Sequence, residues 1–176
     1  MELLNDIRNY EKLERSGKIY LIAFLVALSG ILSILDTMIP KPLPFIKIGI
    51  ANMVTLILVM ECRYKMAIQV SFLRTIVSSL FIGTFLSYTF LLSFSGAIGA
   101  VLFMILFKEA LKGLLSIFGI SLIGAFFNIV FQGIVVVLFF GLDKGTVFMI
   151  SAMSLFSLLN GALIGWISMK IQEKFK

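Results

Sequence analysis

The chain has 176 residues, of which 60% are hydrophobic and only 14% are charged, and its formal net charge is +6. A soluble domain carries roughly 25% charged residues, so this chain has too few polar side chains to cover a water-exposed surface. It contains no histidine and one cysteine, which excludes histidine-based catalysis, imidazole metal sites and an internal disulfide. The composition predicts a membrane protein of one domain without a metal centre.

Residues 1–18 form a charged leader that precedes the first apolar run. A secretory signal would end in a small-residue cleavage site, whereas this run ends in Leu35-Asp36-Thr37. The first run is therefore predicted to be a retained span. The leader is expected to be a short amphipathic cytoplasmic helix or a solvated charged segment.

Six apolar runs are candidate membrane spans. A helix needs about 20 residues, at 1.5 Å each, to cross a hydrocarbon core of roughly 30 Å. The second run is shorter than this, so we expect it to sit low, to thin the bilayer or to be shielded by protein. The long fifth run is expected to tilt or to bend near Gly119 and Gly124. The runs cover residues 19–39, 45–60, 66–86, 89–107, 114–142 and 146–169.

The basic residues predict the orientation. If both termini are cytoplasmic, every one of the 15 lysines and arginines lies inside except Lys41, Lys47, Lys144 and the intramembrane Arg74. The predicted fold is an all-α integral membrane protein with six transmembrane helices across residues 19–170 and a cytoplasmic tail at 171–176. The expected location is a bacterial cytoplasmic membrane. The net positive charge is then explained by the membrane topology and by contact with anionic lipid, and it does not indicate nucleic acid binding.

Residues 36–47 form the first predicted extracytoplasmic loop. Each proline fixes its own φ and biases the preceding residue away from helix. A preorganised lid over a site between the outer helix ends would have this sequence, and so would a simple tight connection. The candidate lid residues are Asp36, Pro40, Lys41, Pro42, Pro44 and Phe45.

Arg74 lies near the middle of the third run, where a charge costs several kcal/mol. It would either anchor an anionic group of a ligand or act as a fixed charge within a polar core. Counted along the helices, Asp36 is about eight rises above Arg74 and is not expected to be its direct partner.

Asn128 and Gln132, four residues apart, are expected to share one face of the fifth run. Their amides suit the edge of a heterocycle, and they equally suit hydrogen bonds between helices. Asn52 is expected to reach the level of Arg74 and Asn128.

Two pairs of small residues mark close-packing faces. Ala23 and Ala27 are one turn apart in the first run, and Gly161 and Gly165 form a GxxxG motif in the sixth. Such spacing lets helix backbones approach closely. The partner is either another helix of this chain or another membrane subunit, and the sequence leaves both open.

A series of short motifs runs along the chain: LDTMIP at 35–40, IGIANMVTL at 48–56, LRT at 73–75, FIGT at 81–84, FLLSFSG at 90–96, and GISLIGA at 119–125 followed by Asn128 and Gln132. The order of these motifs resembles the Gx transporter family, also labelled heptaprenyl diphosphate synthase component I. The chain differs from the family pattern at two positions, with Asp36 where glutamate is expected and Phe127 where histidine is expected before Asn128.

This family is similar to the substrate-binding S components of energy-coupling-factor vitamin transporters. The resemblance implies a six-helix bundle with a lid at residues 40–45, pocket walls from the last three spans, and docking of Ala23 and Ala27 on a coupling subunit with two ATPases. The function expected from it is uptake of a small vitamin-like or anionic molecule. The expected ligand contacts are Arg74, Asn128, Gln132, Asn52, Tyr88 and Ser93.

Two alternatives follow from the same resemblance. Some family members are associated with flavin- and quinone-linked electron export, which would require an extracytoplasmic redox partner. The family label also suggests a component of a prenyl diphosphate synthase, but the chain has no Asp-rich run to hold magnesium and a diphosphate. An enzyme, a catalytic residue and a bound cofactor are therefore not expected.

Overall fold

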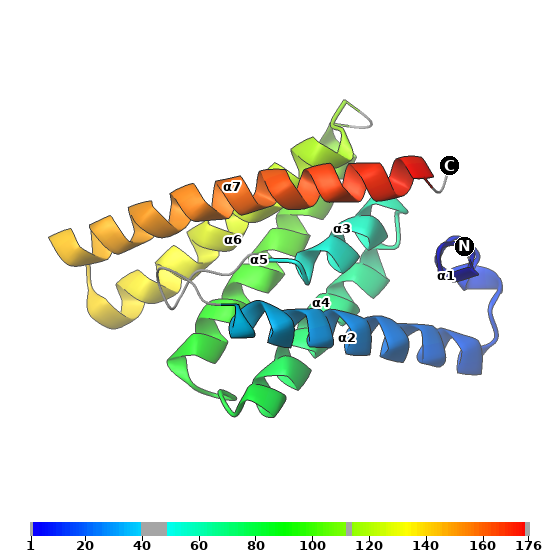
Figure 1. The fold of residues 1–176 in the computed structure, drawn as a ribbon, viewed down its shortest axis with the longest axis horizontal. Coiled ribbons are helices and arrows are strands. Elements are labelled where there is room, and N and C mark those ends of the chain that lie inside the picture. The colour runs from blue at the N-terminus through cyan, green and yellow to red at the C-terminus, as the bar shows by residue number, and fades with distance from the viewer. Residues whose placement is uncertain (1, 40–48, 112–113, 175–176) are drawn as a thin grey trace.

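The computed structural model describes residues 2–39, 49–111 and 114–174, and these form an all-α bundle (Figure 1). No strand occurs among these residues. The elements are α1 (Glu2–Arg8), the 3-10 helix η1 (Tyr10–Lys12), α2 (Arg15–Met38), α3 (Asn52–Met60), α4 (Tyr64–Ile82), α5 (Tyr88–Ala110), α6 (Ile117–Phe140) and α7 (Lys144–Lys174).

Five helices are long and apolar enough to cross a membrane, namely α2, α4, α5, α6 and α7. They correspond to five of the six predicted spans. The exception is α3, whose 9 residues measure about 14 Å at 1.5 Å per residue and cover less than half of a bilayer core. The helix α6 runs without interruption, so neither Gly119 nor Gly124 breaks it.

The short helix α3 is enclosed by protein, which is one of the outcomes expected for a short run. Leu58 and Val59 are completely buried and Leu56 is almost so. The helix packs against α4, α5 and α7, between the pair α2–α4 and the layer α5–α6–α7. Because neighbouring helices surround it, α3 does not need the length of a lipid-exposed span.

Small residues bring α6 and α7 together. A Cβ added at Gly161 would lie 2.4 Å from the Cβ of Ala125, and one added at Gly165 would lie 3.0 Å from the Cβ of Ser121. The hydroxyl of Ser121 donates to the carbonyl of Gly161 at 2.7 Å, and that of Ser157 donates to the carbonyl of Ala125 at 2.9 Å. The GxxxG motif therefore serves packing within the chain.

Ala23 and Ala27, the other pair of small residues, are not packed between two helices of the chain as Gly161 and Gly165 are. Both are exposed, on a face of α2 that also carries Tyr20, Phe24 and Ile31. The face of α2 that packs against α4 is formed instead by Leu25, Ser29 and their buried neighbours.

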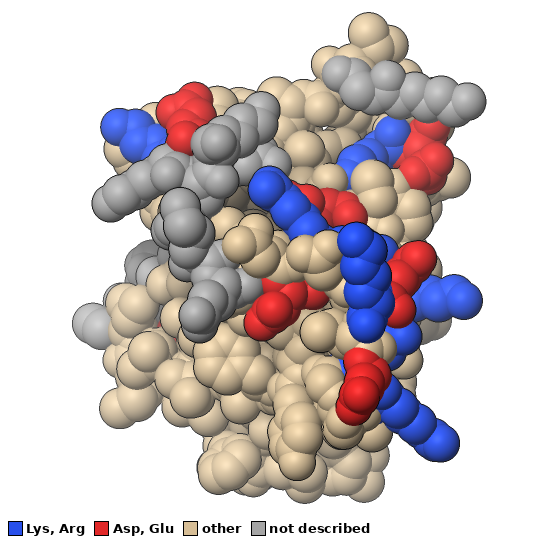
Figure 2. Space-filling view, turned by 90° about the vertical axis from the view of Figure 1, so that its right-hand side faces the viewer, with Lys and Arg blue, Asp and Glu red and all other residues tan. Residues whose placement is uncertain are grey.

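Most of the described charged residues gather at one end of the bundle. The helix α1 and the end of α7 lie together at this end (Figure 1), and lysine, arginine, aspartate and glutamate cluster on the same face (Figure 2). If both termini lie on the same side of a membrane, α1 and the end of α7 are expected to lie at the same end of the bundle, as they do here. That this side is the cytoplasm remains a prediction.

The leader is docked on the bundle and is not a solvated arm. Ile7 is only 2% exposed and packs in the core. The Arg63 guanidinium donates to the carbonyl of Ile7 at 3.0 Å, to the carbonyl of Arg8, and to the carboxylate of Glu11 at 3.2 Å. Arg8 donates twice to Glu61, at 3.0 and 3.1 Å, and this contact raises the pKa of Arg8.

Replacing Arg63 with alanine is expected to release the leader without unfolding the bundle. A hydrogen bond to a charged group contributes about 1.5–3 kcal/mol, so local opening of residues 2–12 should become at least ~10-fold more frequent. Hydrogen exchange by mass spectrometry measures this directly. Replacement of the exposed Lys12 with alanine is the control. Unchanged exchange at residues 2–12 in Arg63→Ala would contradict the docking.

Candidate functional site

A polar cavity of about 110 Å³ lies within the bundle. It is lined by all six helices from α2 to α7 and by the turn before α3. The cavity therefore forms only when these helices pack together. An engineered apolar cavity of about 150 Å³ holds benzene, so this cavity is on the scale of a single ring. Its polar lining is Asp36, Asn52, Arg74, Asn128, Gln132 and Asn160, with the hydroxyls of Ser33, Thr75, Ser78, Ser79, Thr84, Ser93, Ser121 and Ser157.

Arg74 enters the cavity from the middle of α4 and is only 5% exposed. Its Nη2 donates to Oδ1 of Asn52, the first residue of α3. Its Nε makes no hydrogen bond with any residue that the structure describes. A buried donor without an acceptor costs about 1–3 kcal/mol.

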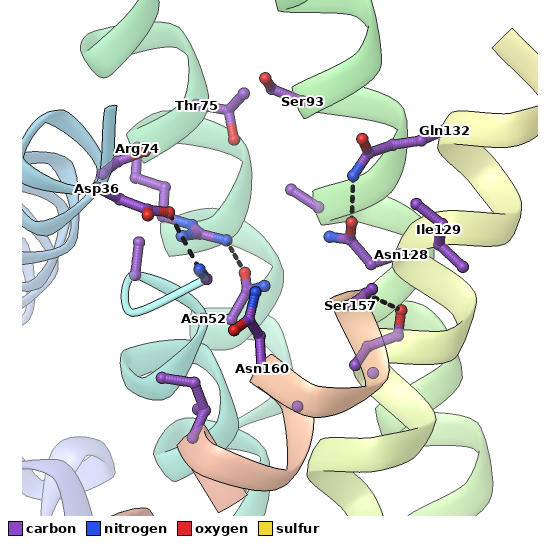
Figure 3. A pocket seen from close by; sticks show the side chains of 18 of the residues that line it. Asp36, Asn52, Arg74, Thr75, Ser93, Asn128, Ile129, Gln132, Ser157 and Asn160 are labelled. Carbon is purple, nitrogen blue, oxygen red and sulfur yellow. Dashed lines mark hydrogen bonds between the residues drawn. The ribbon is translucent and has the colours of Figure 1, made fainter. Parts of the chain in front are cut away.

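The carboxylate of Asp36 lies beside the Arg74 guanidinium and attracts it (Figure 3). The count along the helices placed Asp36 well above Arg74, whereas the structure brings the two charges close enough to interact electrostatically. The hydrogen-bond partner of Arg74 is Asn52. In Figure 1, α2 begins well beyond the end of the bundle where α4 begins. A residue count from the start of α2 and one from the start of α4 therefore do not begin at the same level of the bundle. As a result, the last turn of α2 reaches the level of Arg74.

The turn into α3 depends on Gly49. Its backbone is left-handed, with φ at +79°, which favours glycine. The N–H of Gly49 donates to Oδ2 of Asp36 at 3.0 Å, and its carbonyl accepts from the N–H of Asn52 at 2.8 Å. This turn links Asp36 to Asn52, and both flank the guanidinium of Arg74.

The opposite wall is formed by Asn128 and Gln132 on α6, and Gln132 Nε2 donates to Asn128 Oδ1. The prediction that these side chains share one face is confirmed. A Cβ added at Gly96 of α5 would lie 2.8 Å from Gln132 Nε2 and 2.9 Å from Asn128 Oδ1. The absence of a side chain at Gly96 therefore leaves room for the amide pair.

Of the two remaining predicted ligand contacts, one lines the cavity and the other packs against aromatic side chains. Ser93 lines the cavity. Tyr88 does not: its ring packs against Phe139 and Phe140, with centroids 5.2 Å apart in each case. Phe127, at the position where the resemblance leads us to expect histidine, stacks on Phe103 of α5 with centroids 3.6 Å apart. Of the candidate lid residues, Pro40, Lys41, Pro42, Pro44 and Phe45 lie outside the described residues.

Several lining residues were not singled out from the sequence. On α4, Thr75 and Ser78 line the cavity. With the buried Ser71 and Arg74 they recur at helical spacing, which is the pattern of one polar helix face. That stripe could have been read from the sequence. Asn160 of α7, an amide within the sixth apolar run, was expected to be structural and also lines the cavity.

The fold and the cavity together define a helical membrane protein with a polar site between its helices. The chain belongs to the family described as heptaprenyl diphosphate synthase component I, whose family model matches residues 25–171. This confirms the family resemblance of the motifs. No curated protein and no solved structure matches the chain.

Proposed function

We propose that this protein is a substrate-binding membrane subunit, similar to the S components of energy-coupling-factor transporters. The single observation that carries the proposal is the polar cavity inside an apolar bundle, with a buried arginine and an amide pair on facing walls. Ionisable residues within a membrane protein are costly and commonly mark a pathway or a ligand site. The cavity would bind a small vitamin-like molecule.

Uptake would be driven by a separate ATPase module, reached through a coupling membrane subunit. The exposed face of α2 at Ala23 and Ala27 supports this docking, because no helix of the chain covers it among the described residues. In contrast, Gly161 and Gly165 are already used between α6 and α7. Small exposed side chains allow a second helix to approach closely.

The test is a pull-down of the tagged full chain from its native membrane in mild detergent, with proteins identified by mass spectrometry. We expect a membrane coupling subunit and ATPases to be recovered. Ala23→Leu/Ala27→Leu should remove them, because leucine would hold the partner helix away. Ala110→Leu is the matched control, since Ala110 is exposed at the end of α5.

Recovery of a redox protein or a prenyl synthase without ATPases would contradict the transport proposal. The first result would favour quinone- or flavin-linked electron transfer. The second would favour the role that the family description names.

A further inference from the structure

The charges of the cavity restrict what it can bind, provided that the cavity is the ligand site proposed above. Among the described lining residues, Asp36 and Arg74 alone are charged. They lie side by side and are 2% and 5% exposed, respectively. The two charges on the described part of the lining are therefore opposite in sign and offset one another.

A ligand with a net charge would disturb this balance. An anion placed against Arg74 would also approach Asp36, and a cation placed against Asp36 would approach Arg74. Like charges at close range are unfavourable, and a low-dielectric interior strengthens the effect. Arg74 considered alone favours an anion, whereas Arg74 beside Asp36 disfavours one.

The facing wall offers a donor and an acceptor together. The bond between Gln132 and Asn128 uses one N–H and one carbonyl oxygen. It leaves one amide with an unused oxygen and the other with an unused NH₂, and the description holds if both amides are flipped. No other side-chain hydrogen bond involves these two groups among the described residues. In Figure 3 the nitrogen of Asn128 points across the cavity.

A matching ligand group carries its own acceptor and donor side by side. Primary amides and lactams do so without a charge. The cavity volume of about 110 Å³ suits one ring.

We propose that the cavity binds a small, ring-sized molecule of no net charge that carries a primary amide or lactam group. Asn128 and Gln132 recognise that group, and the adjacent Asp36 and Arg74 reject charged analogues.

The test uses pairs of probes that differ only or mainly in charge: nicotinamide against nicotinate, and uracil against orotate. Binding to the full chain in lipid nanodiscs is measured by calorimetry or ligand-observed NMR. We expect each neutral probe to bind at least ~10-fold more tightly than its carboxylate partner. Asn128→Leu should remove the binding of the neutral probes. Gln69→Leu should not, because Gln69 is an exposed amide of α4 outside the cavity.

A second variant tests the role of the charge pair. Asp36→Asn keeps the shape of the side chain and removes its charge, leaving Arg74 as the only charge on the described lining. The preference should then shift toward the carboxylates by at least ~10-fold.

Two results would overturn the inference. One is wild-type binding of a carboxylate probe as tightly as its neutral partner, which would leave the proposed binding function intact. The other is the failure of both neutral probes to bind with a Kd below ~1 mM. Neither result decides whether ATPases are recovered, so the transport proposal succeeds or fails separately.

Discussion

Arg74→Met is expected to lower the free energy of unfolding by about 3–5 kcal/mol, the range observed when one partner of a buried charge pair is removed. Methionine fills the space of the arginine stem but leaves the carboxylate of Asp36 buried without the cation beside it. It also removes the donor to Asn52, which positions the start of α3. Unfolding of the purified chain in mixed micelles measures the change.

The matched variant is Asp36→Asn/Arg74→Met, in which neither charge remains. Asparagine can still accept the hydrogen bond from the N–H of Gly49. We expect this double variant to be more stable than Arg74→Met alone. If the effects of the two single substitutions add to within about 0.5 kcal/mol, the two side chains are not coupled, and the arrangement described here is wrong.

Gly161→Ala is expected to lower the free energy of unfolding by about 1–3 kcal/mol, the usual cost of overpacking. The new Cβ would lie 2.4 Å from the Cβ of Ala125, so α6 and α7 would have to separate. Separation would also weaken the hydrogen bond from Ser121 to the carbonyl of Gly161. Ala125→Gly in the same chain should recover part of the loss, because it removes the atom in the way.

The control for this prediction is Gly133→Ala in the same helix pair. A Cβ at Gly133 would meet Ile150 at 3.6 Å, an ordinary van der Waals distance. Alanine is also favoured over glycine within a helix by about 1 kcal/mol, so this variant should be neutral or stabilised. Equal destabilisation by Gly161→Ala and Gly133→Ala would show that the close approach at Gly161 is not what holds the two helices.

The membrane class and five of the spans could be predicted because the bilayer itself fixes the length and composition of a spanning helix. The pairing of Asn128 with Gln132 was predictable for a similar reason, since helical periodicity alone places residues four apart on one face. Ala23 and Ala27 are exposed on α2, and their role as a close-packing face for a partner stays a prediction.

Properties that depend on how helices pack were not predictable. The adjacency of Asp36 and Arg74 depends on how far α2 extends beyond α4, and no local sequence pattern sets that offset. Tyr88 has a polar group at the start of α5, but Phe139 and Phe140 at the end of α6 enclose its ring. The brevity of α3 follows from burial by α4, α5 and α7, which is a tertiary effect.

The central claim is that the polar cavity holds a small molecule, and the most direct measurement is untargeted mass spectrometry of what the purified chain retains. The wild-type chain, Asn128→Leu and Gln69→Leu would be purified identically from native membranes and their small molecules released by denaturation. We predict that one neutral compound is retained by the wild-type chain and Gln69→Leu and is lost from Asn128→Leu. The same set of compounds in all three samples would contradict a ligand site at this cavity.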